Sequence, residues 1–290
     1  MADTQTLIDG LDFGEGPRWR DGVLWFSDFY RRAVFTVDAD GHEERVVEVP
    51  QQPSGLGWLP DGRMLVVSMV DQRVMRLEED GSLVEHADVS DVATHHANDM
   101  LVDGHGRAYV GNFGYDLHED LARRPPDEII ADEEAGAAHL ARVDPDGTVT
   151  AEPERLRFPN GMVLLDGGRT LVVAETLGLR LTAFTVRGDG SLVDRRVWAS
   201  TAEGPNGPVA TDGIATDPQG GIWVANGLGQ ECVRFAEGGE VTAAVETSTM
   251  CYACALGGEE GRTLFCMVAP SSDPREVDGK GLGAIEIATV

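Results

Sequence analysis

Short apolar runs alternate with turns rich in glycine and aspartate along this chain. The clearest case is the segment 209–226, VATDGIATDPQGGIWVAN, in which two apolar runs flank a D-P-x-G-G sequence. Proline and paired glycines supply the backbone angles that a tight reversal requires, so this segment predicts a strand, a turn and a second strand. The same strand-turn-strand-turn-strand unit recurs six times, beginning near Phe13, Gln52, His95, Phe158, Val209 and Cys251.

The spacing of these units predicts the fold. The leading residues of the six units, which lie 39, 44, 62, 52 and 42 positions apart, are Glu15, Ser54, Asn98, Asn160, Asp212 and Cys254. Most intervals match the roughly 40–50 residues of a four-stranded propeller blade, and a closed ring leaves few sheet edges unprotected. We therefore expect an all-β, six-bladed β-propeller that occupies residues 1–290 as one domain. The strand-like run at 4–9, TQTLID, is expected to complete the last blade, which is one strand short.

Charge and composition narrow the possible partners and the cellular location. The formal net charge of −27 disfavours binding to nucleic acid or to an anionic membrane. No apolar run is long enough for a membrane helix, and the first ten residues lack the features of a secretory signal. We expect Cys254 and Cys266 to be small buried core residues with reduced thiols, and the protein to be cytoplasmic and a monomer or weak homodimer.

The propeller geometry suggests a metal site. The first strand of each blade lines the channel of a propeller, so its leading residues approach one mouth of that channel. Four of these residues, Glu15, Asn98, Asn160 and Asp212, carry carboxylate or carboxamide oxygens, which are the ligands of calcium or magnesium; manganese and zinc are further possibilities. The alternative is that each Asn or Asp belongs to an ordinary turn. Their recurrence at equivalent positions favours one divalent cation.

Five motifs along the chain carry a family resemblance. They are GEGPRW (14–19), HHANDM (95–100), FPNGM (158–162), TDGIA (211–215) and CALGGEEGRTLF (254–265). With these motifs in this order, the chain resembles the senescence marker protein / gluconolactonase / regucalcin family over nearly its whole length. The resemblance implies a six-bladed propeller that binds one divalent cation through Glu15, Asn160 and Asp212, with Asn98 at the metal or holding substrate beside it. The related diisopropylfluorophosphatase is similar in placing one Glu, two Asn and one Asp around calcium.

Such a site favours ester hydrolysis. A divalent cation, calcium being the first expectation, acts as a Lewis acid on a carbonyl or phosphoryl oxygen, and Asp212 is the candidate general base or nucleophile. The leading hypothesis is therefore a metal-dependent hydrolase that opens a small-molecule lactone or similar ester. Two alternatives stay open, namely hydrolysis of phosphoesters or organophosphates and a calcium-binding regulatory propeller without turnover.

The substrate side departs from the family pattern at one position. Relatives that open sugar lactones carry an arginine two residues before the channel asparagine, whereas this chain has His96. Strand alternation places His96 and Asn98 on the same side and His95 on the other, so we expect His95 to be structural. A histidine cannot make the bidentate contacts of a guanidinium, which puts an aldonolactone substrate in doubt. The alternative is that His96 only hydrogen-bonds a neighbouring site residue.

An acidic insertion at 115–138 separates the second and third strands of the third unit. Long segments of this kind are usually functional or disordered, so it is either a lid over the pocket or a solvated loop. As a lid, it would place Phe113, Tyr115 and Asp116 near the substrate. Glu175 and Asn226 end the second strands of the next two units, and we expect them to cap the backbone or support the site rather than bind metal.

Overall fold

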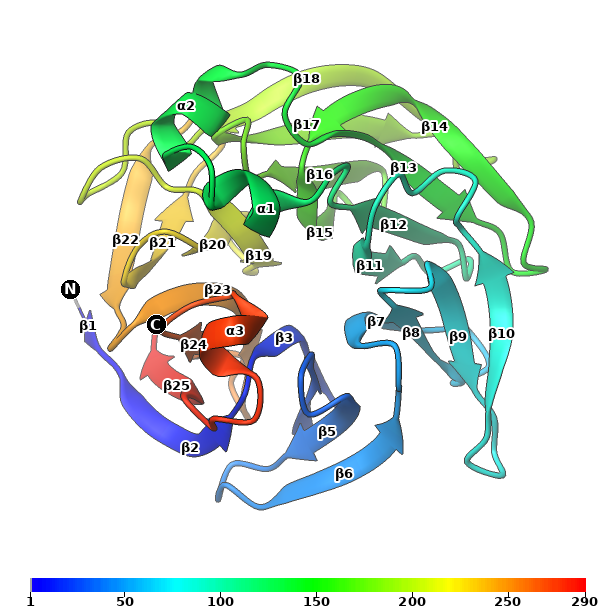
Figure 1. The fold of residues 1–290 in the computed structure, drawn as a ribbon, viewed down its shortest axis with the longest axis horizontal. Coiled ribbons are helices and arrows are strands. Elements are labelled where there is room, and N and C mark those ends of the chain that lie inside the picture. The colour runs from blue at the N-terminus through cyan, green and yellow to red at the C-terminus, as the bar shows by residue number, and fades with distance from the viewer. Residues whose placement is uncertain (1) are drawn as a thin grey trace.

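The computed structural model describes residues 2–290, which form six sheets arranged as a ring around a common axis (Figure 1). Each sheet contains four antiparallel strands, and one sheet carries a further short parallel strand at its outer edge. The innermost strands of neighbouring sheets contact one another around the axis. In the first five sheets the chain runs from the innermost strand outward before the next sheet begins. The prediction of a six-bladed β-propeller is confirmed.

Four layers of strands build the ring. The innermost strands are β3 (Gly14–Arg20), β7 (Pro53–Trp58), β11 (Ala97–Val102), β15 (Pro159–Leu165), β19 (Thr211–Thr216) and β23 (Met250–Gly257). The second strands are β4 (Val23–Asp28), β8 (Met64–Ser68), β12 (Ala108–Asn112), β16 (Thr170–Glu175), β20 (Ile222–Asn226) and β24 (Thr263–Ala269). The third strands are β5 (Ala33–Val37), β9 (Arg73–Leu77), β13 (Ala137–Val143), β17 (Arg180–Val186), β21 (Glu231–Phe235) and β25 (Gly283–Thr289). The outermost strands are β6 (Glu43–Glu48), β10 (Leu83–Asp88), β14 (Val149–Arg157), β18 (Leu192–Ser200), β22 (Val241–Glu246) and β2 (Gln5–Leu11).

The N-terminal segment closes the ring, as the sequence predicts. Strand β2 pairs antiparallel with β25 and supplies the outermost strand of the sixth blade. A further short strand, β1 (Ala2–Asp3), pairs parallel with β22 of the fifth blade. Residues 2–11 therefore bridge the fifth and sixth blades, and they join the two ends of the chain through backbone hydrogen bonds rather than through a covalent link.

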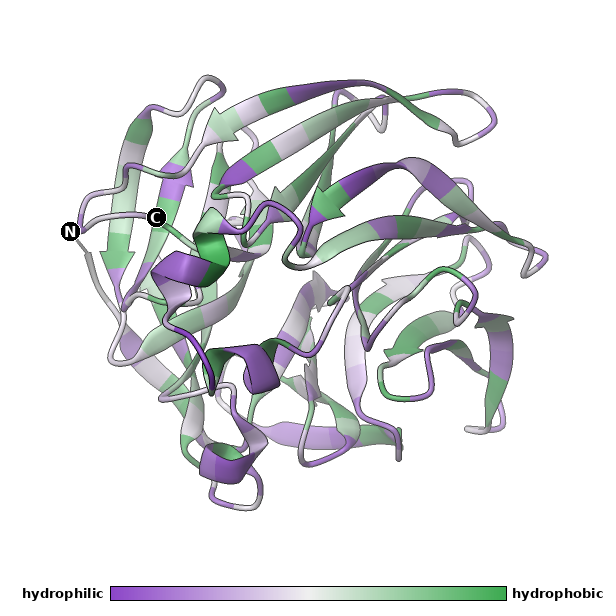
Figure 2. Cartoon of the chain, turned by 45° about the horizontal axis from the view of Figure 1, so that its top comes forward, coloured by the Kyte–Doolittle hydropathy of each residue, from purple (hydrophilic) through white to green (hydrophobic). Residues whose placement is uncertain are grey.

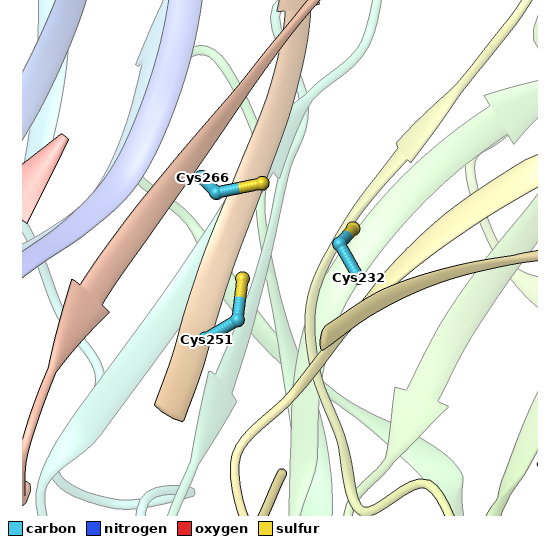
Figure 3. A group of neighbouring side chains, drawn as sticks. All are labelled: Cys232, Cys251 and Cys266. Carbon is cyan, nitrogen blue, oxygen red and sulfur yellow. The ribbon is translucent and has the colours of Figure 1, made fainter. Parts of the chain in front are cut away.

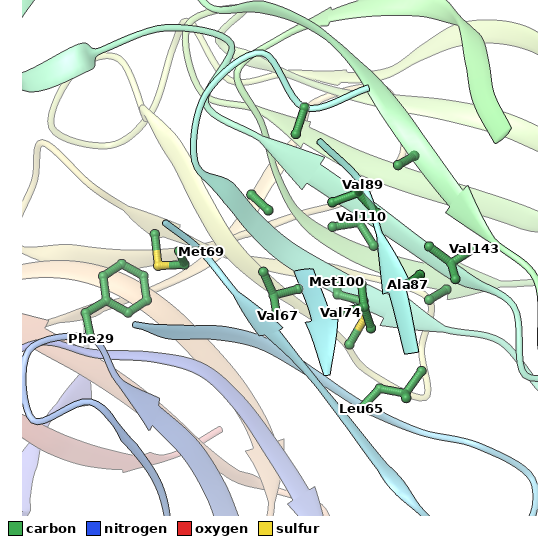
Figure 4. Close-up of a cluster of buried hydrophobic side chains, with 14 of the residues drawn as sticks. Phe29, Leu65, Val67, Met69, Val74, Ala87, Val89, Met100, Val110 and Val143 are labelled. Atoms are coloured by element: carbon green, nitrogen blue, oxygen red, sulfur yellow. The ribbon is translucent and has the colours of Figure 1, made fainter. Parts of the chain in front are cut away.

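The core lies between the blades. Every residue of β8 is buried, whereas β6, an outermost strand, is largely exposed, and Figure 2 shows the same contrast between apolar inner strands and hydrophilic outer ones. A cluster between the second and third blades packs Leu65 and Val67 against Met100 and Val110, all of them at most 1% exposed (Figure 4). Each blade thus buries both faces of its inner strands, which explains their nearly continuous apolar runs.

All four cysteines are buried and free, as predicted for Cys254 and Cys266. The Sγ atoms of Cys232, Cys251 and Cys266 lie within 4.8 Å of one another between the fifth and sixth blades (Figure 3). The Cys254 thiol approaches the carbonyl oxygens of Gly213 and Trp223 at 3.6 and 3.5 Å. These thiols pack as small core side chains.

Three short helices lie in connections between strands. Helices α1 (Leu117–Leu121) and α2 (Pro126–Ala131) occupy the insertion between β12 and β13, and α3 (Pro274–Val277) lies between β24 and β25. The Asp116 carboxylate caps α1 by accepting a hydrogen bond from the backbone N–H of Glu119. The insertion is thus a pair of helices rather than an open loop. Within residues 2–290, no helix combines the length and apolar character that crossing a membrane demands.

Deleting residues 1–9 tests the closure. The truncation removes β1 and most of β2, so the backbone of β25 loses its outer partner. We expect the melting temperature to fall by about 5 °C or more, because a loss of about 2 kcal/mol shifts a chain of this size by several degrees. Removal of residues 1–3 alone, which takes away only β1, should cost less. Unchanged melting of the longer truncation, followed by circular dichroism, would contradict this role for the N-terminal strand.

Candidate metal centre and cavity

Each of the six innermost strands has a break in regular pairing near its start. Such an irregularity re-aims a side chain and bends the strand, and it recurs here in every blade. The residues at these breaks are Glu15, Ser54, Asn98, Asn160, Asp212 and Tyr252. Tyr252 therefore replaces Cys254 as the leading residue of the sixth unit. The error arose because the sequence does not reveal the break in pairing between Cys251 and Ala253.

Neighbouring innermost strands approach one another closely at the residues that directly follow these positions. A Cβ atom added to Gly55 would lie 2.1 Å from the backbone nitrogen of Met100, and one added to Gly161 would lie 2.5 Å from that of Ile214. No side chain fits at such distances, so glycine is required for the contact between neighbouring blades. This close packing brings the preceding residues, Ser54 and Asn160, toward the common axis.

The four predicted oxygen donors all line one cavity at this end of the ring. Asn98 Nδ2 donates to Asn160 Oδ1 at 3.2 Å, and Asn98 Oδ1 accepts from the Ser54 hydroxyl at 3.1 Å. Asn160 Nδ2 in turn lies 3.3 Å from Thr176 Oγ1, whose hydroxyl donates to a backbone carbonyl of β19. The two carboxamides are thereby oriented by a chain of hydrogen bonds that runs across the second to fifth blades.

Glu15 and Asp212 are the two carboxylates of this group. Burial raises the pKa of Glu15 well above its ordinary value, and the negative charges of Asp212 and Asp99 raise it further. Burial likewise raises the pKa of Asp212, with Asp99 adding to the effect. The backbone N–H of Gly16, which donates to Glu15 Oε2 at 2.9 Å, opposes the shift for Glu15.

These residues fit a divalent cation. No arginine or lysine is among the described residues that line the cavity, and the charge of the Arg18 guanidinium, outside the cavity, does not offset the effects that raise the pKa of Glu15. Buried carboxylates without a cationic partner are costly unless they are protonated or coordinate a metal. Two carboxylates and two carboxamides are hard oxygen donors of the kind that calcium and magnesium take. The residues that could hold the ion are Glu15, Asn98, Asn160 and Asp212.

Asp99 is a third buried carboxylate that the sequence-based prediction missed. It is 3% exposed, its Oδ1 accepts no hydrogen bond, and the nearest cation is the Arg18 guanidinium at 3.9 Å. Burial raises its pKa. In the other five units the position equivalent to Asp99 is a glycine or an alanine, namely Gly16, Gly55, Gly161, Gly213 and Ala253. An alignment of the six units would therefore have identified Asp99 as an exception. Its charge strengthens the negative field at the site without its lining the cavity.

The cavity has a volume of about 500 Å³ and a largely apolar wall. Four of the five predicted substrate-side residues line it, namely His96, Asn98, Phe113 and Asp116. Tyr115, which was also expected near the substrate, is not among the lining residues, because its ring packs behind the wall in an apolar cluster with Phe158 and Ile129, which do line the cavity.

The prediction that His95 points away from the cavity is also wrong. His95 lines it together with His96, and the two ring centroids are 4.3 Å apart. Strand alternation does not apply at this point, because β11 begins only at Ala97. Burial first, and then the neighbouring His95, lower the pKa of His96 to about 4, so His96 is neutral near pH 7.

Glu175 and Asn226 have structural roles, in agreement with expectation. The Glu175 carboxylate accepts from Arg180, from Thr182 and from the backbone N–H of Arg157. Burial alone would raise its pKa, but these hydrogen bonds outweigh burial and lower it. Asn226 Oδ1 accepts from the backbone N–H of Ala210 and thereby caps the segment that leads to Asp212. Both residues hold the ends of the second strands.

A second acidic group, whose residues do not line the cavity, lies on an exposed turn. Asp38, Asp40 and His42 could bring three ligand atoms together. The Asp38 carboxylate, however, already accepts hydrogen bonds from the backbone N–H groups of Asp40 and His42 and contacts the His42 ring. This arrangement is an aspartate-stabilised turn.

Two curated proteins are similar to this chain over most of its length. Among curated proteins, the chain is 24% identical over 273 residues to a pentonolactonase of Haloferax volcanii, covering 93% of this chain and 86% of the relative. It is also 24% identical over 296 residues to an L-arabinolactonase of Azospirillum brasilense, covering 99% and 90% of the two chains.

Solved structures show the same fold. A gluconolactonase of Xanthomonas campestris superimposes with a TM-score of 0.75 at 23% identity, covering 98% of this chain and 89% of the other. A regucalcin of Agrobacterium tumefaciens, described as a calcium-binding protein, gives a TM-score of 0.78 at 20% identity, covering 99% and 95%. The family model described as the SMP-30/Gluconolactonase/LRE-like region matches residues 13–269, which is most of the sequence. The chain therefore belongs to the SMP-30/gluconolactonase family, and the resemblance seen in its motifs is confirmed.

Proposed function

We propose that the protein is a divalent-metal-dependent hydrolase that opens a lactone. The observation that carries this proposal is the set of two carboxylates, the buried Glu15 and the half-buried Asp212, and two buried carboxamides, which line a small-molecule-sized cavity without a lysine or arginine among its described lining residues. The lactonase names of two curated relatives support the reaction class. A cavity with a few convergent polar groups is the usual form of an active site.

In this proposal, Glu15, Asn98, Asn160 and Asp212 hold one divalent cation. Calcium is the first expectation because all four donors are oxygens, and a structural relative is described as calcium-binding. Magnesium, manganese and zinc accept the same donors with different preferences. When bound, the cation supplies a Lewis acid for the ester carbonyl and lowers the pKa of water in the site.

In this proposal, Asp212 accepts the proton of the attacking water molecule. Its carboxylate lies in the cavity, and a water molecule attacking the lactone carbonyl loses a proton to it while the ring C–O bond breaks. The departing ring oxygen then takes up a proton, and the product is a hydroxy acid. Direct attack by the Asp212 carboxylate, followed by hydrolysis of the resulting anhydride, uses the same position and is the alternative role.

Replacing Asp212 tests this role. We expect Asp212→Asn to reduce kcat for lactone opening by about 10²–10³-fold, because the amide cannot accept the proton. The matched control is Asp194→Asn, which changes an exposed aspartate on an outer strand and should leave kcat unchanged. The measurement is pH-stat titration of the acid released from a panel of lactones, with and without chelator. Full activity of Asp212→Asn, or activity insensitive to chelator, would contradict the mechanism, whereas calcium binding without turnover would favour the regulatory alternative.

A second prediction concerns metal and stability. Because the folded-state pKa of Glu15 is raised above 4.5, the metal-free folded protein binds its proton more tightly than the unfolded chain does. The contribution of this group to stability is therefore greatest at low pH and declines as pH rises above about 4.5. In chelator, we expect Glu15→Gln to melt higher than the unmodified protein, by a margin that grows from pH 5 to pH 8.

Added calcium should reverse that order, because only the unmodified protein gains binding free energy. Thermal unfolding with calcium or chelator measures both effects, and the difference between the two proteins cancels the contribution of the histidines. The exposed Glu237→Gln is the control and should track the unmodified protein under all conditions. If calcium stabilises Glu15→Gln as much as it stabilises the unmodified protein, Glu15 is not a ligand of the metal.

A further inference from the structure

The wall of the cavity indicates which lactones fit. We propose that the preferred substrate carries an apolar chain or ring on the lactone, rather than the hydroxyl groups of a sugar-derived lactone. This inference rests on the proposed hydrolase function, and it concerns the part of the cavity that extends beyond the four oxygen donors.

Aromatic side chains from two parts of the ring form much of the wall. Phe13 packs against Phe29, Tyr30 and Tyr252 with ring centroids 5.1, 6.1 and 4.7 Å apart, and all four rings line the cavity. They come from the first and sixth blades and their connections. Together they offer a broad apolar surface of the kind that binds hydrocarbon.

The third and fourth blades contribute a second aromatic group. The Phe113 ring lies 4.7 Å from that of Phe158 and 5.9 Å from that of His96, and all three line the cavity. The insertion adds aliphatic side chains, with Leu117 and Leu121 from α1 and the Ile129–Ile130 pair from α2. These helices therefore act as an apolar lid, and their acidic residues, such as Glu128, face solvent.

The rim of the cavity is apolar as well. Six large apolar side chains are exposed on the described surface, and three of them line this cavity, namely Val70 at 42%, Leu121 at 38% and Leu228 at 55% exposure. Single exposed apolar residues are common, but their concentration around one opening indicates a binding surface. An apolar substituent that extends from the lactone ring toward solvent would cover these residues.

The polar groups of the wall are poorly suited to a polyhydroxylated ligand. No lysine or arginine is among the described lining residues, and the Asp116 carboxylate already accepts a hydrogen bond from the backbone N–H of Glu119. His118 Nε2 already lies 3.2 Å from the Ser272 hydroxyl. Each sugar hydroxyl buried against the apolar wall without a partner would lose binding free energy.

A panel of lactones with the same six-membered ring tests the inference. The probes are δ-valerolactone, δ-nonalactone and D-glucono-1,5-lactone, assayed by pH-stat with the Asp212→Asn protein as the background for uncatalysed opening. We expect kcat/KM for δ-nonalactone to exceed that for D-glucono-1,5-lactone at least tenfold. From δ-valerolactone to δ-nonalactone, kcat/KM should rise about two- to fourfold for each methylene of the alkyl chain, until the chain reaches solvent.

A pair of leucine variants links this preference to the cavity. Leu228→Asn changes a rim residue, whereas Leu282→Asn changes a leucine of similar exposure, 51%, that lies outside the cavity. We expect Leu228→Asn to lower the ratio of kcat/KM for δ-nonalactone to that for δ-valerolactone about threefold, and Leu282→Asn to leave it unchanged. Leu121→Asn, on α1, provides a second rim variant, and circular dichroism verifies the folding of all three.

The outcomes separate the two proposals. If D-glucono-1,5-lactone is opened as fast as δ-nonalactone or faster, the substrate inference fails while the lactonase function stands. An equal alkyl preference in both leucine variants would also overturn the inference, because the cavity rim would then not recognise the chain. If none of the three lactones is opened above the Asp212→Asn background although calcium still stabilises the protein, the proposed function fails as well.

Discussion

The repulsion between buried carboxylates at the centre of the ring is the constraint on which the site depends. Glu15 and Asp212 come from the first and fifth blades, and Asp99 from the third adds a further negative charge. Side chains with like charges separate unless the backbone prevents it. Here the backbone is held by six interlocking sheets, with an N-terminal strand that completes the last blade. The energy gained by closing the ring therefore keeps the proposed cation-binding arrangement in place, because the same contacts that pack the blades hold the carboxylates together.

The same irregularity in strand pairing, repeated in all six blades, orients the side chains of the oxygen donors. The break in pairing at the start of each innermost strand directs one side chain toward the axis, and close contact with the next blade requires a small residue just after it. Where that small residue is replaced by Asp99, a carboxylate is buried behind the cavity lining instead of in the cavity. The repeat thus produces a ring of positions whose chemistry changes with one residue per blade while the backbone stays the same.

In the proposed function, reaction chemistry and substrate recognition come from different parts of the molecule. The four oxygen donors lie on the innermost strands, which are rigid and fully packed. The surrounding wall comes from connections between strands and from the helical insertion, which includes α1 and α2. Connections tolerate changes in sequence and length far better than packed strands do, so one metal centre can serve different substrates. The apolar wall of this chain, with His96 and His95 instead of a guanidinium, is one such combination.

Much of the architecture can be predicted from the sequence, because the residue patterns that specify strands and turns are local. The spacing of the six units predicted the propeller, the run at 4–9 predicted the closing strand, and the positions of Glu15, Asn98, Asn160 and Asp212 in their units predicted that they converge. These inferences need only the period of the repeat and the knowledge that blades surround one axis. They hold even though the intervals between units vary, since insertions lie in connections and leave the order of strands unchanged.

Only the tertiary structure decided the features that depend on register and on contacts between distant segments. Tyr252 rather than Cys254 leads the sixth unit because a pairing irregularity interrupts the alternation of side chains there. His95 lines the cavity because it precedes β11, so strand alternation does not apply to it. Tyr115 turns into a cluster with Phe158, and Asp99 becomes a buried charge, because residues remote in sequence surround them. The sequence by itself determined the repeat and its oxygen donors, whereas packing between blades determined which neighbouring side chains share the cavity with them.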